Sequence, residues 1–332
     1  MTGQLPLLRL ELPFTFLNGI FLVQLPVCLD MPGAMALQAT YQHILRKRPN
    51  RIAFDLSWTT FIDSSGIGVL VSSLRTAEEH GIELVIWSVH PQIRAALFLA
   101  GLNQFMMTDS EIKAITLANT HQLKYQLPTY HPSVSSWAKR LLDIIGASIG
   151  LGITALLFIP IAIAIKLDSP GPILFGQTRC GWLGSHFRLW KFRSMVANAE
   201  ELKAQVNNQV KGPFFKNKTD PRITRLGHFL RRTSLDELPQ FWNVLKGEMS
   251  LVGTRPPTLD EVDQYTLPMW QRLDVKPGIT GEWQANGRSQ ISNFEDVIQL
   301  DLRYQQKWSL LYDLKLIFKT LVILFRRNNG AS

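Results

Sequence analysis

The sequence predicts a chain of two domains: a small α/β domain, then a larger, mainly α-helical α+β domain that associates with a membrane. Three observations lead to this prediction. The 332 residues are 46% apolar and 18% charged, which suits two folded cores and excludes a disordered chain. Short apolar strands alternate with helices before residue 115. A long apolar segment begins near residue 137.

The charge of the chain is concentrated in its second part. The formal net charge is +9, and residues 1–136 carry nine basic and nine acidic side chains. The whole excess therefore lies in residues 137–332, where the expected partner is nucleic acid, acidic lipid or a phosphorylated substrate. The two cysteines, Cys28 and Cys180, favour a reducing compartment over a disulfide framework or a zinc site. The N-terminus has no signal-peptide pattern, so nothing indicates export.

The elements of the first domain, residues 1–115, follow from hydrophobic periodicity. Residues 52–56 and 83–89 are predicted strands, and residues 66–80 form a predicted helix between them. A further helix is expected to begin at Pro91, because proline is accepted in a first helical turn. Residues 116–136 have no sustained apolar period and are interpreted as a linker.

One motif of this domain stands out, Phe61-Ile-Asp-Ser-Ser-Gly-Ile-Gly68, at the junction of a strand and a helix. Ser64 or Ser65 is expected to cap the helix, and the glycines to allow tight packing. The stretch FDLSWTTFIDSSGIGVL resembles the STAS domain of anti-sigma factor antagonists. The resemblance implies that Ser64 is a candidate for regulatory phosphorylation and that the surrounding surface docks a protein partner. A purely structural role is the alternative.

The apolar segment is the first membrane element. Residues 141–167 contain only two charges, Asp143 and Lys166, and are long enough to cross a bilayer. Pro160 within them predicts a kink or a break. Basic residues flank both ends, among them Lys139 and Arg140, so the positive-inside rule favours a helix 137–167 that enters the cytoplasmic leaflet and returns. Lys139 and Arg140 are expected to lie near lipid headgroups. An ordinary transmembrane helix is the alternative, and a buried core helix fits less well.

A second membrane element is predicted at the C-terminus. Apolar residues recur at helical spacing from Leu310 to Phe325, with Lys315, Lys319, Arg326 and Arg327 elsewhere on the helix or after it. This pattern suits an amphipathic interfacial helix on acidic lipid, and a core helix is the competing interpretation.

The chemistry is predicted between these two membrane elements. Ser234-Leu-Asp-Glu237 has the pattern of a capping box, which accounts for Ser234 and Glu237. It does not explain Asp236 or the adjacent Arg231 and Arg232. Neighbouring carboxylates beside guanidinium groups suit phosphoryl chemistry, in which one carboxylate attacks phosphorus and the other holds a divalent cation.

Four segments together carry a second resemblance: KFRSM, DPRITRLGHFLRRTSLDELPQFWNVLKGEMSLVGTRPPT, KPGITGEWQANGRS and LDLRYQQKWSLLYDLKLIFKT. They resemble the bacterial sugar transferases that load a sugar 1-phosphate onto polyprenyl phosphate. The resemblance implies a monotopic enzyme with a re-entrant helix hairpin at the cytoplasmic face of the bacterial inner membrane. It also implies a UDP-sugar donor, undecaprenyl phosphate as acceptor, UMP as product and a role in exopolysaccharide assembly.

The resemblance also implies roles for individual residues. Asp236 matches the nucleophile that forms a phosphosugar-aspartyl intermediate, and Glu237 matches the carboxylate that binds Mg²⁺ beside it. The candidates for binding substrate phosphates are Lys191, Arg193, Arg231, Arg255 and Arg288. The sequence departs from the family at Ile159-Pro160, where the hairpin bend is commonly Ser-Pro, and at Gly253-Thr254-Arg255-Pro256, where the pattern is commonly Gly-Pro-Arg-Pro.

Two other classes of function remain. A catalytically silent, membrane-anchored scaffold is the alternative, although the intact Asp236-Glu237 pair argues against it. Nucleic-acid binding is disfavoured, because the arginines lie in Gly- and Pro-rich turns without an aromatic stacking motif. A membrane enzyme with a docking domain is also a candidate for self-association. The sequence does not identify the sugar.

Overall fold

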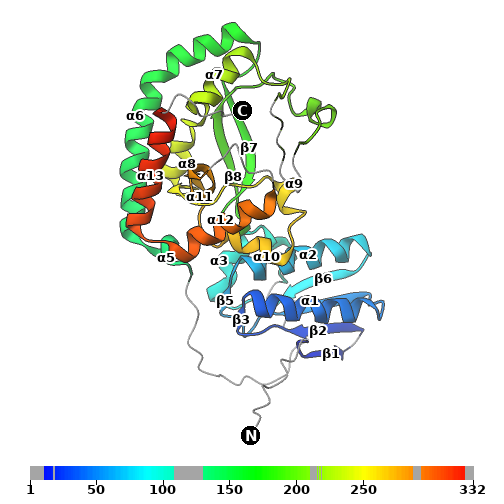
Figure 1. Ribbon diagram of the computed structural model, residues 1–332. Helices are drawn as coiled ribbons and strands as arrows, with labels where there is room; N and C mark the ends of the chain where they lie inside the picture. The colour runs from blue at the N-terminus through cyan, green and yellow to red at the C-terminus, as the bar shows by residue number, and fades with distance from the viewer. Residues whose placement is uncertain are drawn as a thin grey trace. The chain divides into compact units, whose positions relative to one another are not determined.

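The structure, a computed structural model, forms two compact units. It describes residues 11–17, 19–107, 130–209, 215, 217, 219–286 and 293–325. The first unit comprises Met1–Tyr130 with two later segments, Leu183–Ser185 and Thr266–Gln271, and the second unit comprises the remainder. In Figure 1 the main segment of the first unit runs from blue to cyan, and most of the second runs from green to red.

The first unit is an α/β domain with one main sheet of strand order β1-β2-β4-β6. Strand β1 is antiparallel to β2, and β2, β4 and β6 are mutually parallel. A separate parallel pair joins β3 to β5. The strands are β1 (Phe14–Leu17), β2 (Ile20–Gln24), β3 (Cys28–Leu29), β4 (Arg51–Asp55), β5 (Phe61–Ile62) and β6 (Glu83–Trp87). The helices are α1 (Met31–Leu45), α2 (Ser64–Glu79), α3 (Pro91–Leu99) and the 3-10 helix η1 (Leu102–Phe105).

The α/β class predicted for this part is confirmed, and the predicted strands and helices are β4, α2, β6 and α3. The prediction of a serine cap is wrong. Asp63 is the N-cap of α2, and its Oδ1 accepts a hydrogen bond from Gly66 N at 2.8 Å. Ser64 and Ser65 lie inside the first turn and are fully buried. The carboxylate of Asp63 can cap the helix because it stands one residue before the first turn.

The expected tight packing is confirmed at Gly66. A Cβ atom added there would lie 2.1 Å from the backbone oxygen of Leu29, which is shorter than any real contact of that kind. Any larger residue would separate the start of α2 from the β3 strand. The Asp-Ser-Ser-Gly motif therefore has a structural function in this domain.

The described residues of the second unit are mainly helical with two strand pairs, as predicted for an α+β domain. Its strands form an antiparallel hairpin and a parallel pair: β7 (Leu174–Cys180) with β8 (His186–Phe192), and β9 (Ser250–Val252) with β10 (Gly278–Thr280). Its helices are α5 (Pro132–Ser135), α6 (Trp137–Asp168), α7 (Arg225–Thr233), α8 (Gln240–Lys246), α9 (Leu259–Val262), α11 (Glu282–Ala285), α12 (Phe294–Lys307) and α13 (Leu310–Phe325). Shorter 3-10 turns are η3 (Glu201–Gln205), η4 (Leu235–Glu237) and η5 (Gln271–Leu273), while α10 (Leu267–Trp270) and η2 (Trp182–Gly184) lie mostly in the segments assigned to the first unit.

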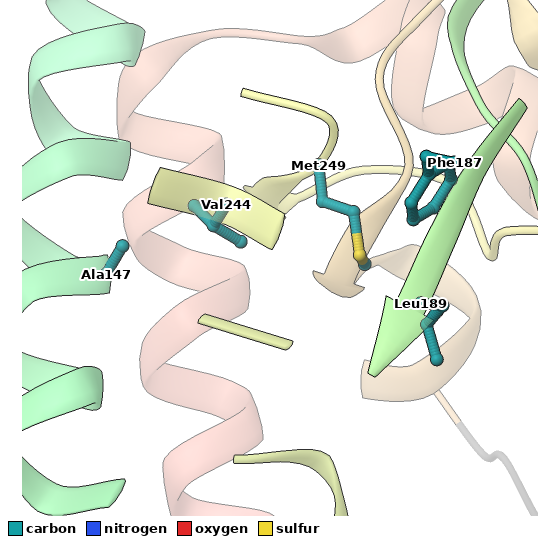
Figure 2. Packing of buried hydrophobic residues seen from close by; sticks show 5 residues of the cluster. All are labelled: Ala147, Phe187, Leu189, Val244 and Met249. Atoms are coloured by element: carbon teal, nitrogen blue, oxygen red, sulfur yellow. The ribbon is translucent and has the colours of Figure 1, made fainter. Parts of the chain in front are cut away.

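A buried cluster holds the β7–β8 hairpin close to helix α6. Figure 2 shows its members, Ala147 of α6, Phe187 and Leu189 of β8, Val244 of α8 and Met249. Close packing of α6 on α8 depends on small residues. A Cβ atom added at Gly150 would lie 2.4 Å from the ring of Phe241. One side of α6 therefore carries small residues that allow close packing against α8.

The opposite side of α6 exposes large apolar side chains. By length and composition α6 could cross a membrane, and it is the one such helix among the described residues. Leu156 and Leu167 are 78% and 83% exposed. Helix α13 lies beside α6 (Figure 1) and exposes a similar stripe that includes Leu311 and Phe318. Apolar surfaces of this kind mark an interaction with lipid or protein.

Of the kink or break expected at Pro160, the break is absent, because α6 is helical from Trp137 to Asp168. Figure 1 shows instead that α6 bends toward its C-terminal end. Proline removes one backbone donor and can bend a helix without interrupting it. Within the predicted linker, residues 132–135 form the short helix α5, and residues 116–129 lie outside the described residues.

Two basic residues expected at lipid headgroups are instead held inside the second unit. Lys139 is buried and pairs with Asp313. Arg140 donates hydrogen bonds to the backbone oxygens of Val244 and Leu245, 2.8 and 2.6 Å away, at the C-terminal end of α8. These contacts correct the prediction that the two basic residues at the start of α6 lie near lipid headgroups. Arg326 and Arg327 lie outside the described residues.

Candidate active site

Asp236 and Glu237 lie in the 3-10 turn η4, between helices α7 and α8. Helix α7 ends because Ser234 adopts a left-handed conformation with φ of 55°. Its side chain caps no helix, so the predicted capping box at Ser234 and Glu237 is wrong. The turn instead holds the two acidic residues next to each other in the chain, with Asp236 buried and 5% exposed. A capping box is instead present at Thr258 and Glu261, at the start of helix α9.

Lys191 and Glu237 meet, as expected for two residues of one site. Lys191 Nζ donates to Glu237 Oε1 at 2.9 Å, and the two side chains are 28% and 15% exposed. Lys191 stands near the end of β8, and η4 packs against that strand. The positive charge of the lysine is thereby held next to the carboxylate pair.

Arg231 belongs to the same region through its contact with Ser194. Arg231 Nε donates to Ser194 Oγ at 2.9 Å. Ser194 follows β8 by two residues, and Arg231 lies in the last turn of α7. The motif after β8 and the motif around η4 are therefore brought together by both Lys191 and Ser194. The sequence prediction did not single out Ser194, although it forms part of the KFRSM segment.

Arg193 does not join this group. Its side chain is buried, and Nη1 and Nη2 donate to the backbone oxygens of Pro170 and Ser169 at 2.7 and 2.6 Å. These oxygens lie at and just beyond the C-terminus of α6, where carbonyl groups lack helical partners. The structure therefore gives Arg193 the role of a helix cap in place of the expected phosphate contact.

Arg255 lies in the turn that follows β9 and is held by Glu261. Its two terminal nitrogens donate to the two carboxylate oxygens of Glu261 at 2.7 and 3.0 Å. Burial alone would raise the pKa of Glu261, but the charge and hydrogen bonds of Arg255 hold that pKa below its ordinary value. Glu261 was missed from the sequence, although the spacing of Thr258 and Glu261 in a capping box is a signal for it.

Two expected site residues remain. Arg288 lies outside the described residues, so the structure does not test its predicted role. Ser64 lies in the first unit, buried in the first turn of α2. A phosphate on Ser64 would therefore require a local rearrangement of that turn.

A magnesium ion fits the donor chemistry of η4. Mg²⁺ is usually bound by one or two carboxylates together with water and substrate phosphates. Asp236 and Glu237 supply two such carboxylates, and no group of three or more His, Cys, Asp or Glu residues that could hold a metal is present in the described ranges, η4 included. When bound, the ion would supply electrostatic screening of phosphate oxygens.

Comparison with known proteins identifies the two parts of the chain. The family model of the bacterial sugar transferases matches residues 134–327, and that of the STAS domain matches residues 13–122. The chain belongs to the bacterial sugar transferase family and carries an N-terminal STAS domain.

Three of the curated relatives that match this chain show the range of similarity. A galactosyl transferase CpsE of Streptococcus agalactiae serotype III is 51% identical over 192 residues, which are 56% of this chain and 42% of the relative. A UDP-glucose:undecaprenyl-phosphate glucose-1-phosphate transferase of Escherichia coli K12 is 43% identical over 57% of this chain and 40% of the relative. The exopolysaccharide production protein ExoY of Rhizobium meliloti is 37% identical, over 57% of this chain and 85% of the relative. The chain thus spans about two fifths of the length of the first two relatives.

Proposed function

We propose that this protein transfers a sugar 1-phosphate from a UDP-sugar to polyprenyl phosphate, the first step of an exopolysaccharide or related glycan. The observation that carries the proposal is the buried Asp236 beside Glu237 in η4, with the ammonium group of Lys191 bound to Glu237 at 2.9 Å. The name of the Escherichia coli relative gives undecaprenyl phosphate as the acceptor of that enzyme. The similarity of this chain to that relative supports the same class of acceptor for this protein.

In the proposed mechanism Asp236 is the nucleophile. One carboxylate oxygen attacks the sugar-bearing phosphorus of the donor, an O–P bond forms, and the bond from that phosphorus to the bridging oxygen breaks. UMP leaves with the bridging oxygen and its electron pair. An oxygen of polyprenyl phosphate then attacks the same phosphorus, the aspartyl O–P bond breaks, and polyprenyl-diphosphate-sugar is released.

The other residues have supporting roles in this mechanism. Lys191 and Arg231 would balance the negative charge of the phosphates as the substrate approaches Asp236. Glu237, bound to Lys191, would hold the cation beside the nucleophile. Because a metal-dependent site loses its ion to a chelator, UMP release should stop with EDTA and return with added Mg²⁺.

The test is UMP release from a panel of UDP-sugars by the full chain in membranes that contain polyprenyl phosphate. We expect one UDP-sugar to be used and Asp236→Asn to abolish the release. The control is Asp260→Asn, which makes the same chemical change at an exposed side chain of the second unit. Undiminished release by Asp236→Asn would exclude Asp236 as nucleophile. No release by the wild type from any sugar would favour the membrane-anchored scaffold.

We also propose that both units lie on the cytoplasmic side of the inner membrane, with α6 entering and leaving the same leaflet. The exposed apolar faces of α6 and α13 support an embedded position, and the bend of α6 is compatible with return to one side. Cysteine probes placed after Leu167 and in the first unit should react only with a membrane-permeant reagent. Labelling of the second unit by an impermeant reagent in intact cells would contradict this topology.

For the STAS domain we propose regulated docking of a protein partner through the surface around Ser64. A phosphate there would meet the positive end of α2 and the carboxylate of Asp63, which changes the charge at the start of the helix. Ser64→Asp should lose a partner that wild type and Ser64→Ala retain in pull-down. Equal recovery with all three proteins would contradict the proposal.

A further inference from the structure

Three buried polar atoms near the turn Gly253–Pro257 have no hydrogen-bond partner in the part of the chain that the structure describes. They are Thr254 Oγ1, Gln284 Oε1 and Arg179 Nε. Thr254 is 1% exposed, so its hydroxyl cannot be satisfied by bulk water. Buried polar groups are nearly always paired, and several unpaired ones in one place call for an explanation. A ligand that supplies the missing partners is one such explanation.

The three side chains come from separate segments that converge on this turn. Arg179 Nη1, on β7, donates to the backbone oxygen of Pro256 at 2.9 Å. Gln284 belongs to α11, and its Oε1 and the backbone oxygen of Gly253 face the same point beside Gly281. A Cβ atom added at Gly281 would lie 3.1 Å from the first and 2.0 Å from the second. The absence of a side chain at Gly281 therefore keeps these groups close together.

The charges around the turn favour an additional anion. Arg255 pairs with Glu261, and Arg272 pairs with the buried carboxylate of Asp301. The guanidinium of Arg179 has only neutral acceptors among the described residues, Pro256 O and Gln177 Oε1. Burial and the nearby Arg255 lower the pKa of Arg179 to about 10, and the charges of Glu261 and Glu200 offset this lowering only in part. An anionic group bound to Arg179 would offset both effects.

The β7–β8 hairpin relates this turn to the carboxylates of η4. Arg179 is paired with Phe187 and Phe175 with Lys191, so Arg179 and Lys191 project from the same face of the hairpin. The two pairs are four residues apart along β8, which corresponds to about 13 Å along the strand. Leu189 lies between the two positions on the same face and is buried in the cluster of Figure 2, so a ligand shared by Arg179 and Lys191 would lie along the edge of that cluster. A nucleoside diphosphate is an extended molecule of a length that suits this separation.

We propose that Arg179, Thr254 and Gln284 bind the nucleoside monophosphate half of the donor, with Arg179 at the α-phosphate and the other two at the base. This inference rests on the proposed function. Uracil offers a ring N–H between two carbonyl oxygens. The Thr254 hydroxyl donates to a carbonyl, and Gln284 Oε1 accepts from the ring N–H. Cytosine has an acceptor at that ring position, so the same pair of groups selects uridine over cytidine.

The test is direct binding of UMP and CMP to the purified full chain in nanodiscs, by calorimetry. Thr254→Val and Gln284→Met should each weaken UMP binding about tenfold and reduce the preference for UMP over CMP. Arg179→Gln should weaken binding of both nucleotides to a similar extent, because it contacts phosphate. The matched controls are Thr178→Val and Arg188→Gln, two positions paired with each other on the opposite face of the hairpin. Both should bind UMP like the wild type.

The melting temperature of Thr254→Val distinguishes a role of Thr254 in nucleotide recognition from a role in the stability of the fold. Valine is isosteric with threonine, so the removal of an unpaired buried hydroxyl should leave the melting temperature unchanged or raise it. The inference would be overturned if all three variants, Thr254→Val, Gln284→Met and Arg179→Gln, bound UMP with the affinity of the wild type.

Repeating the titrations on Asp236→Asn separates the two proposals. UMP binding that depends on Thr254 in this background supports the recognition site even if no UDP-sugar is turned over. The wild type could release UMP while UMP binding is unaffected in Thr254→Val, Gln284→Met and Arg179→Gln. That result would overturn the recognition site and leave the proposed function standing.

Discussion

Lys139 and Asp313, 174 residues apart in the sequence, form a buried ion pair with 2.6 Å between Lys139 Nζ and Asp313 Oδ2. The pair joins the first turn of α6 to the first turn of α13. Tyr304 OH donates to Asp313 Oδ1 at 2.9 Å, and Lys139 Nζ also donates to the backbone oxygen of Val252 at 3.0 Å. The two apolar helices are thus fixed to each other and to β9 through one polar network.

Breaking this pair should destabilise the second unit strongly. Lys139→Met leaves the carboxylate of Asp313 buried without its cation, and we expect a loss of about 3–5 kcal/mol. The double variant Lys139→Met/Asp313→Leu removes both charges and should recover most of that loss. Thermal unfolding in detergent measures both effects. If Lys139→Met has the same melting temperature as the wild type, the ion pair makes no net contribution to the stability of the second unit.

Arg193 should behave as a helix cap and not as a substrate-binding residue. Arg193→Gln removes most of its hydrogen bonds to Ser169 and Pro170, for an expected loss of about 1–3 kcal/mol in stability. The KM for the UDP-sugar should not change. A normal melting temperature together with a raised KM would restore the phosphate-binding role predicted from the sequence.

The pair of Arg255 and Glu261 predicts a dependence of stability on pH. The pKa of Glu261 is lowered in the folded state, so its stabilising contribution is complete above its ordinary pKa of 4.5 and is lost as the pH falls through the folded value. Glu261→Gln should therefore lower the melting temperature at neutral pH and have a smaller effect at about pH 3. The control is Glu201→Gln, at an exposed glutamate of the same unit. An equal effect of Glu261→Gln at both pH values would contradict the prediction.

The exposed apolar stripe of α13 should contribute to membrane attachment. Phe318 is 69% and Leu311 78% exposed, and a charge at either position would be unfavourable at a lipid interface. Phe318→Glu should reduce flotation of the protein with anionic vesicles. Met35→Glu, at an exposed apolar residue of the first unit, serves as the control. Equal flotation of Phe318→Glu and the control would indicate that α13 does not contact lipid.

Much of the fold could be predicted from local pattern. The strands β4 and β6 and the helix α2 follow the alternation of apolar residues, and the apolar run from 141 to 167 marks α6. The caps could not be assigned as reliably. Ser64 and Asp63 are both good N-cap residues, and only the backbone path places Asp63 at the cap. Ser234 has the capping spacing, but its left-handed conformation directs the chain into η4 instead.

For the candidate site, the motifs and the family they resemble were sufficient to select Asp236, Glu237, Lys191 and Arg231. The sequence by itself determined the class of chemistry through the resemblance of its four motif segments to one family, because an Asp-Glu pair beside arginines is alone a weak signal. Only the tertiary structure decided which basic residues have protein partners. Lys139, Arg193 and Arg255 are each bound to groups within the second unit, whereas Arg179 meets only neutral acceptors among the described residues. Such partners depend on contacts between distant segments, and the burial that makes them strong is a property of the folded chain, not of any local pattern.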